Sequence, residues 1–321
     1  MNTIAHPATG AAPGPGPTPS TDDPSGLRPA ARRSRWAWQP AYLFLAPSLL
    51  ILGIFIVYPI GQSLWISLHD WSIGADEQPW VGLGNYRELF ADPRFWNALK
   101  VTLLFTVVSV GIQLVLGFLL AQWLQTTDRL TSFLRSVYFF PTIVSLASIG
   151  LVWRFLLDPQ IGLVGGWTEL IGLSPVNWLQ SSTWALPAVI FVGIWKNLGF
   201  TMLLMLAGLQ GVPKDLYEAA RLDGANRRQL VRFVTLPSMR PTLLFTAVIL
   251  TINSLQLFDL VFAMTDGGPL FETETLVTYM YRRGFEEFRF GYASAIAWVL
   301  FALIMVVSTL QLRLFRYSDV D

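Results

Sequence analysis

The chain has 321 residues, of which 53% are hydrophobic, 14% are aromatic and only 13% are charged, and its formal net charge is +1. A typical soluble domain carries about 25% charged residues, so lipid rather than water must cover much of this surface, and the small net charge excludes a nucleic-acid binder. The chain has no cysteine and only two histidines, which excludes disulfides and thiolate metal sites and argues against histidine-based catalysis.

Residues 1–35 are rich in proline, alanine, glycine and serine and contain almost no large apolar side chain. Such a stretch buries too little surface to offset its chain entropy, so we expect a disordered tail before a membrane domain over residues 36–321. Arginines and then an apolar run follow, which is also the order of parts in a signal peptide. The run is longer than a signal core and lacks a small-residue cleavage site, so we expect an uncleaved span.

Six apolar stretches are long enough to cross a bilayer core, which takes about 20 residues of helix. They are residues 42–64, 99–122, 137–157, 184–208, 241–263 and 293–315. Several contain proline, which spanning helices tolerate when neighbouring helices satisfy the freed carbonyl groups. The sequence therefore predicts an all-α integral membrane protein with six transmembrane helices.

Six spans place both ends of the chain on the same side of the membrane, and the basic residues indicate which side. With both ends in the cytoplasm, fourteen basic residues lie in the inner segments, namely Arg28, Arg32, Arg33, Arg35, Arg129, Arg135, Lys214, Arg221, Arg227, Arg228, Arg232, Arg240, Arg313 and Arg316. Seven lie in the outer segments, namely Arg87, Arg94, Lys100, Arg154, Arg282, Arg283 and Arg289. This bias predicts a multi-pass protein of the cell membrane with cytoplasmic termini.

The same bias places residues 209–240 in the cytoplasm, and we expect two short helices there. Pro213 suits the first helical position, because its missing N–H would be unpaired there anyway, and Glu218 is expected in the first turn. Asp223 and Gly224 are expected to break the helix, since glycine can adopt a positive φ and aspartate can cap the helix that follows.

The second helix of this segment is expected to end at Leu236 and Pro237, just before the fifth span. Leu216, Ala219 and Ala220 give the first helix a narrow stripe of mostly small apolar side chains. A solvated hairpin is the simpler interpretation, but a hairpin needs far fewer residues. Small alanines at helical spacing let another surface approach closely, which indicates a docking element.

The string that runs from Glu218 to Ala225 and is followed by Leu236-Pro237 resembles the EAA loop of bacterial ATP-binding-cassette (ABC) importer permeases. In that family this loop forms the coupling helices that fit into a cleft of the ATPase subunit. The resemblance implies that the ATPase-coupling residues are Glu218, Ala219, Ala220, Asp223, Gly224, Leu236 and Pro237. The position of the string, between the fourth and fifth of six spans, also matches the family.

Further strings are similar to the carbohydrate branch of this family, the maltose and glycerol-phosphate type. They are residues 82–86 with 95–96, residues 195–200, residues 258–259, residues 265–269 and residues 291–295. The resemblance covers roughly residues 40–315. It implies a permease that moves a sugar or sugar-like solute inward by alternating access, with a glycerol-phosphate compound as the alternative solute.

The resemblance also implies the partners. They are a second permease subunit in a heterodimer, two ATP-binding-cassette ATPase subunits, an extracytoplasmic solute-binding protein and the lipid bilayer. ATP and Mg would be bound by the ATPase, so we expect no cofactor, metal or catalytic residue in this chain, and no enzyme activity. The sequence contains no P-loop, which agrees with that division of labour.

Polar residues within the spans are the candidates for the solute path, because an unpaired polar group in lipid is costly. The candidates are Gly193, Asn197, Phe200, Asn253, Ser254 and Gln256. An amide, a hydroxyl and an aromatic ring facing one path would suit a sugar, which presents hydroxyl groups and flat apolar faces. The alternative is that these groups only hydrogen-bond neighbouring helices, as polar side chains in membranes often do.

Two competing functions follow from the charged residues. An ion-coupled secondary transporter would need buried acids in several spans, and only Asp259 qualifies. A membrane enzyme would need a cluster of histidine or acidic residues at one membrane interface, and the sequence shows no such cluster. Lys196 is interpreted as structural and Asp259 as a helix-packing or gating residue. The charged residues 282–289 are interpreted as a solvated outer segment that could also meet the binding protein.

Overall fold

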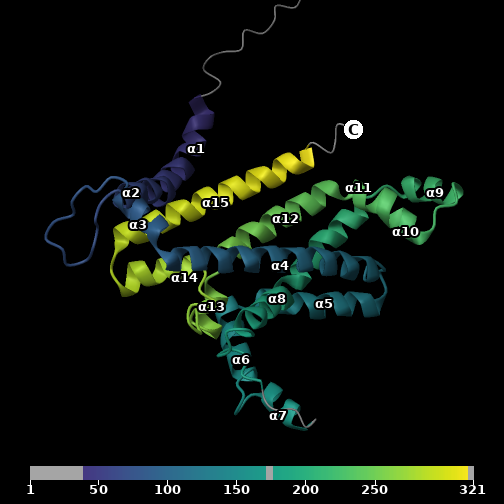
Figure 1. The fold of residues 1–321 in the computed structure, drawn as a ribbon. Coiled ribbons are helices and arrows are strands. Elements are labelled where there is room, and N and C mark those ends of the chain that lie inside the picture. The colour runs from purple at the N-terminus through teal and green to yellow at the C-terminus, as the bar shows by residue number, and fades with distance from the viewer. Residues whose placement is uncertain (1–38, 171–175, 317–321) are drawn as a thin grey trace, which may run out of the picture. The chain divides into compact units, whose positions relative to one another are not determined.

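The computed structural model describes residues 39–170 and 176–316, and every regular element within them is a helix (Figure 1). Strand-like pairing in this part of the chain is limited to two isolated bridges, His69 with Trp80 and Ser72 with Arg289. The predicted all-α fold class is confirmed. The predicted tail over residues 1–35 lies outside the described residues.

The chain forms two compact units that divide between Val57 and Tyr58. The first unit contains α1 (Gln39–Leu52) and the π-helical turn η2 (Gly53–Val57). The second unit begins with α2 (Tyr58–Ser67), α3 (Gly84–Ala91), α4 (Pro93–Trp123), α5 (Arg129–Ile143), α6 (Leu146–Leu156), α7 (Leu163–Leu170) and α8 (Ala185–Gln210). It continues with α9 (Lys214–Leu222), α10 (Arg227–Gln229), η3 (Leu230–Thr235), α11 (Leu236–Ser238), α12 (Arg240–Leu255), α13 (Asp259–Met264), α14 (Leu276–Tyr281), η4 (Arg282–Glu286) and α15 (Phe290–Arg316).

Four stretches of helix are long and apolar enough to cross a membrane, namely Phe44–Ser67, Pro93–Trp123, Ala185–Gln210 and Phe290–Leu314. Two further stretches pass the same test only as bent pairs, α5 with α6 and the helices of residues 227–238 with α12. The number of spans therefore reaches the predicted six if each bent pair is one span. The bends change how two of the predicted spans are built.

The predicted third span, residues 137–157, is not one continuous helix. It breaks between α5 and α6, whose axes differ by 98°. Pro141 has no N–H to donate within α5, and Val144 then takes an extended conformation with φ −74° and ψ 143°. Gly199 of α8 faces the carbonyl of Tyr138 so closely that no Cβ would fit, which brings α5 directly against α8.

The predicted fifth span, residues 241–263, is also interrupted. α12 ends at Leu255, and α13 begins only at Asp259. The carbonyl of Leu257, which a continuous helix would pair with an N–H four residues on, accepts instead the hydroxyl of Thr275 at 2.7 Å. The chain therefore leaves α12 and starts a short helix that packs on α6.

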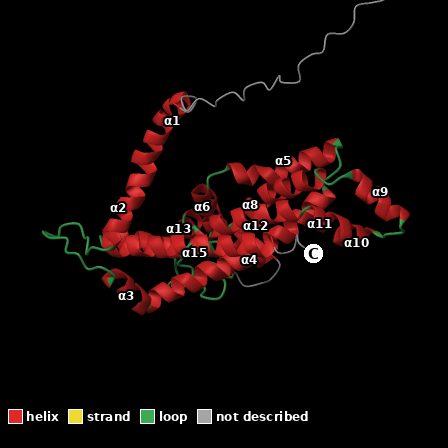
Figure 2. Ribbon diagram, turned by 90° about the horizontal axis from the view of Figure 1, so that it is seen from above, coloured by secondary structure: helices red, strands yellow, loops and turns green. Residues whose placement is uncertain are grey.

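The buried core of the second unit consists of three clusters arranged along α4 and α8, which pack against each other over most of their length. One joins α4, α6, α8 and α13 through residues such as Phe105, Val192 and Leu260. A second, with Tyr279 and Tyr292, gathers at the start of α4, and a third lies around the ends of α4 and α8. Figure 2 shows α9 and α10 beyond the latter end. The predicted coupling segment therefore lies near the C-terminal ends of α4 and α8, whereas the predicted solute-path residues lie nearer the middle of α8 and at the C-terminal end of α12.

Candidate functional site

The segment predicted to couple to an ATPase is a pair of helices joined by a sharp turn. The first, α9, begins at Lys214, with Pro213 as its N-cap at φ −59° and ψ 133°. The prediction that Pro213 is the first helical residue is therefore wrong by one position. Glu218 lies in the second turn rather than the first, where only Asp215 supplies a carboxylate.

The turn after α9 is a Schellman motif centred on Gly224. Gly224 has φ +81°, as expected from the sequence, and its N–H donates to the carbonyl of Arg221 at 3.0 Å. The N–H of Ala225 donates to the carbonyl of Ala220 at 2.9 Å, which completes the motif. Side chains other than glycine or asparagine are strained at this φ, so the residue at position 224 fixes the angle between the two helices.

The second helix is capped by Asn226, not by Asp223 as predicted. The N–H of Gln229 donates to Asn226 Oδ1 at 3.0 Å, and the N–H of Asn226 donates to Gln229 Oε1 at 2.8 Å, which is a capping box. The cap lies here because two residues of turn follow Asp223 before the helix can start. Asp223 itself is the C-cap of α9.

Leu236 and Pro237 lie in the last turn of this helix, which ends one residue later than predicted, at Ser238. Leu236 donates its N–H to the carbonyl of Val231 five residues back, so a π-helical stretch runs directly into α11. Pro237, the second residue of α11, has no N–H to donate, and the helix ends at the next residue. The bend of 69° comes at Met239, and α12 starts at the next residue.

α9 is exposed along its whole length. None of its residues is buried, and Leu222 at its end is 89% exposed. Ala219 is exposed and Ala220 partly so, which leaves room for another backbone to approach. A hydrogen bond of 3.0 Å between the hydroxyl groups of Tyr217 and Thr235 ties α9 to the following helix. The pair can therefore move as one piece.

All six residues predicted for the solute path line one cavity of about 280 Å³. The fourth predicted span, α8, contributes Gly193, Asn197 and Phe200, and α12 with its C-terminal cap contributes Asn253, Ser254 and Gln256. The absence of a side chain at Gly193 lets the ring of Phe105 approach, since an added Cβ would lie 3.0 Å from it. The structure thus brings these predicted residues together, although they are some fifty positions apart along the chain.

Most polar side chains of this cavity make no hydrogen bond with another described residue of the chain. The Asn197 amide donates one N–H to the carbonyl of Gly193 one turn earlier at 3.2 Å, which leaves its second N–H and its oxygen available. The side chains of Asn253, Ser254 and Gln256 form no hydrogen bond with any described residue. Amide and hydroxyl groups that line a cavity without partners can hydrogen-bond a polar solute.

Gln113 is a residue of the same cavity that the sequence analysis did not single out. It lies on α4, is 2% exposed, and its Oε1 has no hydrogen-bond partner. An unpaired buried amide oxygen costs about 1–3 kcal/mol, so this side chain is poised for a partner outside the described residues. The signal in the sequence was an amide in the middle of an otherwise apolar run.

Lys196 and Asp259 both line this cavity, together with Phe105 and Leu260. No ion pair joins them within the part of the chain that the structure describes. The hydroxyl of Thr142 donates to the carbonyl of Lys196 at 3.1 Å, which fixes the backbone at this position. The structure thus places Lys196, which was interpreted as structural, beside the candidate solute path.

The charged residues 282–289 are not a simply solvated segment as predicted. Arg283 pairs with Asp92 at 2.9 Å and with Glu287 at 2.6 Å. Arg289 pairs with Glu88 through two contacts of 2.7 Å, and its guanidinium lowers the pKa of that carboxyl below its usual value. These pairs fasten the start of α15 and the segment before it to α3 and the start of α4.

Comparison with known proteins adds to this geometry. The family model described as "Binding-protein-dependent transport system inner membrane component" matches residues 113–319. The "Probable ABC transporter permease protein YurN" of Bacillus subtilis is 36% identical over 282 residues, which are 86% of this chain and 95% of that protein. The "Trehalose/maltose transport system permease protein MalF" of Thermococcus litoralis is 33% identical over 276 residues, 86% of this chain and 93% of that one.

A solved structure is also similar in fold. It is the crystal structure of a bacterial ABC transporter involved in the import of the acidic polysaccharide alginate. The similarity has a TM-score of 0.77 at 26% sequence identity and covers 88% of this chain and 96% of that chain. The family match at residues 113–319 takes in both the coupling helices and most of the cavity.

Proposed function

The chain belongs to the family of binding-protein-dependent transport system inner membrane components, the permeases of ABC importers, and on that premise we propose that it passes a carbohydrate from an external binding protein into the cytoplasm. The observation that carries this proposal is the cavity between α8 and α12. Its unpaired amide and hydroxyl groups beside Phe105 and Phe200 suit the hydroxyl groups and flat faces of a sugar. A relative named for trehalose and maltose supports the same substrate class.

The path from the coupling helices to the cavity is short and direct. α9 is tied to Thr235, α11 follows, and α12 then runs from Arg240 to Leu255. A helix of that length spans about 24 Å, with Asn253 and Ser254 at its far end. Rotation of the coupling helices would therefore tilt α12 and open or close the cavity, which is how an ATPase could drive alternating access.

We propose the other subunits of the importer on the basis of the family resemblance. This chain would pair with a second permease, and each would seat its coupling helices on one of two ATPases that bind ATP and Mg. A solute-binding protein would dock on the outer side, near the ion-paired segment of residues 282–289. Both termini would be cytoplasmic, and this chain would have neither a cofactor nor a catalytic role of its own.

The test is the ATPase activity of the assembled complex in nanodiscs, with binding proteins loaded with neutral sugars, uronic acids or glycerol phosphate. Stimulation by a sugar-loaded binding protein is expected. Stimulation by glycerol phosphate alone would replace the proposed substrate class, and an absence of stimulation by every loaded binding protein would contradict the proposed function.

A further inference from the structure

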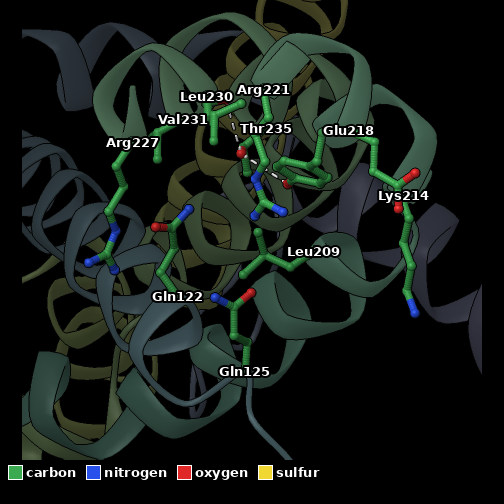
Figure 3. A pocket seen from close by; sticks show the side chains of 11 residues that line it. Gln122, Gln125, Leu209, Lys214, Glu218, Arg221, Arg227, Leu230, Val231 and Thr235 are labelled. Carbon is green, nitrogen blue, oxygen red and sulfur yellow. Dashed lines mark hydrogen bonds between the residues drawn. The ribbon is translucent and has the colours of Figure 1, made fainter. Parts of the chain in front are cut away.

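A second cavity, of about 370 Å³, lies under the coupling helices (Figure 3). Its floor is formed by Gln122 and Gln125 at the end of α4, and its walls carry Lys214 and Arg221 of α9 and Arg227 of α10. Figure 3 shows the Arg221 side chain entering the middle of this pocket, with Lys214 and Arg227 at opposite sides. The solute cavity is separate and shares no lining residue with it.

The pocket has an excess of positive charge that the chain does not neutralise. Three cationic side chains line it against a single carboxylate, Glu218. None of these four forms an ion pair with a described residue, whereas every ion pair found there joins residues 88–94, 266–274 and 282–289. The amides of Gln122 and Gln125 have no partner either. Two guanidinium groups with nearby amide donors are the groups that bind a phosphate best.

The position of the pocket indicates where such a phosphate would come from. α4 ends at Trp123, whose side chain is 61% exposed, and α8 ends at Gln210. Exposed tryptophan at a helix end is typical of the boundary between lipid tails and water. Basic pockets between the ends of spanning helices on the cytoplasmic side meet the headgroups of anionic lipids.

We propose that this pocket binds the phosphate of an anionic phospholipid and thereby fixes the coupling helices to the ends of α4 and α8. The inference rests on the proposed function only for its placement on the cytoplasmic side. The headgroup would bridge Arg221 and Arg227 to the amides of α4. Among the described residues, the only side-chain hydrogen bond between α9 and η3 joins Tyr217 and Thr235, so a bridge from both helices to the end of α4 would stiffen the link between ATPase and permease.

The experiment uses the assembled importer in phosphatidylcholine nanodiscs that contain a minor fraction of phosphatidylglycerol. The lipid that stays with the complex after detergent extraction is counted by mass spectrometry. The double variant Arg221→Gln and Arg227→Gln should retain at least about tenfold less phosphatidylglycerol, since two charge-assisted contacts are lost. Arg228→Gln is the matched control, because Arg228 is exposed, neighbours Arg227 on α10 and does not line the pocket.

Equal retention by wild type and the double variant would overturn the proposal, as would an equal loss in Arg228→Gln. Binding of radiolabelled inorganic phosphate without retention of phosphatidylglycerol would assign the pocket to a soluble anion instead. Loss of the lipid when ATPase subunits are added to the permease pair would show that protein fills the pocket. Solute-stimulated ATPase activity of the wild-type complex, measured on the same nanodiscs before detergent extraction, tests the proposed function separately.

Discussion

Arg94 holds the carboxylate of Glu274 through two hydrogen bonds of 2.7 Å, although the two residues are 180 positions apart and the Glu274 side chain is fully buried. Arg282 also lies 3.6 Å from Oε1 of the same carboxylate, and it pairs with Asp266 at 3.0 Å. One buried acid thus ties the start of α4 to the segment between α13 and α15. This pairing fixes how those two parts of the chain pack together.

Glu274→Gln should lower the free energy of unfolding by about 1–3 kcal/mol, because Arg94 and Arg282, whose side chains are only 22% and 16% exposed, lose the carboxylate that pairs with them. The apparent Tm of the purified complex, followed by scanning fluorimetry, should fall. Glu272→Gln is the control, since Glu272 is exposed and makes no ion pair with a described residue. A Glu274→Gln protein as stable as this control would show that the buried pair contributes nothing.

The orientation can be tested with single cysteines, because the native chain has none. Leu270→Cys should react with a membrane-impermeant thiol reagent in cells whose outer barrier is permeabilised, and Leu222→Cys should not. Both side chains are highly exposed, at 86% and 89%, so accessibility within the protein does not separate them. Labelling of position 222 from outside would reverse the topology and remove the coupling helices from the cytoplasm.

Gly224→Pro should uncouple ATP hydrolysis from transport while leaving membrane insertion intact. Proline fixes φ near −65°, whereas the turn needs +81°, and it removes the N–H that donates to Arg221. Gly224→Asn is the matched control, since asparagine keeps the N–H and tolerates a positive φ. The measurement is the stimulation of ATPase activity by the solute-loaded binding protein. Wild-type stimulation in the proline variant would mean that this turn does not transmit the coupling.

Asn197→Leu and Ser254→Leu should reduce transport strongly, because each fills the cavity and removes a hydrogen-bonding group from it. A single lost hydrogen bond is worth only about 0.5–1.5 kcal/mol, so alanine variants should show a loss of several fold at most. Ser63→Leu is the control, since Ser63 lines an apolar groove between α2 and α15 instead. If the leucine variants transport normally, or fail because the complex does not assemble, these residues hold helices together and contact no solute.

The all-α fold class, with apolar helices long enough to cross a membrane, was predictable from the sequence, because a continuous apolar run in a membrane has few alternatives to a helix. The breaks after Pro141 and Leu255 were not. Proline is tolerated within many spanning helices, and the break after Leu255 depends on the hydroxyl of Thr275, which comes from a distant part of the chain. Composition alone does not indicate such tertiary hydrogen bonds.

In the candidate sites, too, some residues could be predicted from the sequence and others could not. Asn197 and Ser254 were identifiable as polar groups in apolar runs, and Gln113 satisfied the same criterion but was not singled out. The ion pair of Arg94 with Glu274 could not be predicted, because both residues lie in segments that connect predicted spans, where charged side chains are usually solvated. The capping roles of Asn226 and Pro213 depend on backbone geometry that is specified only to within one or two residues by sequence.

The central claim is that this chain imports its solute with ATP hydrolysed by a separate subunit. The most direct measurement is uptake of radiolabelled sugars into proteoliposomes that contain the complete complex, with binding protein outside and ATP inside. Uptake should require both ATP and binding protein, should continue when ion gradients are collapsed, and should be lost in Gly224→Pro. Uptake driven by a proton or sodium gradient without ATP would contradict the account.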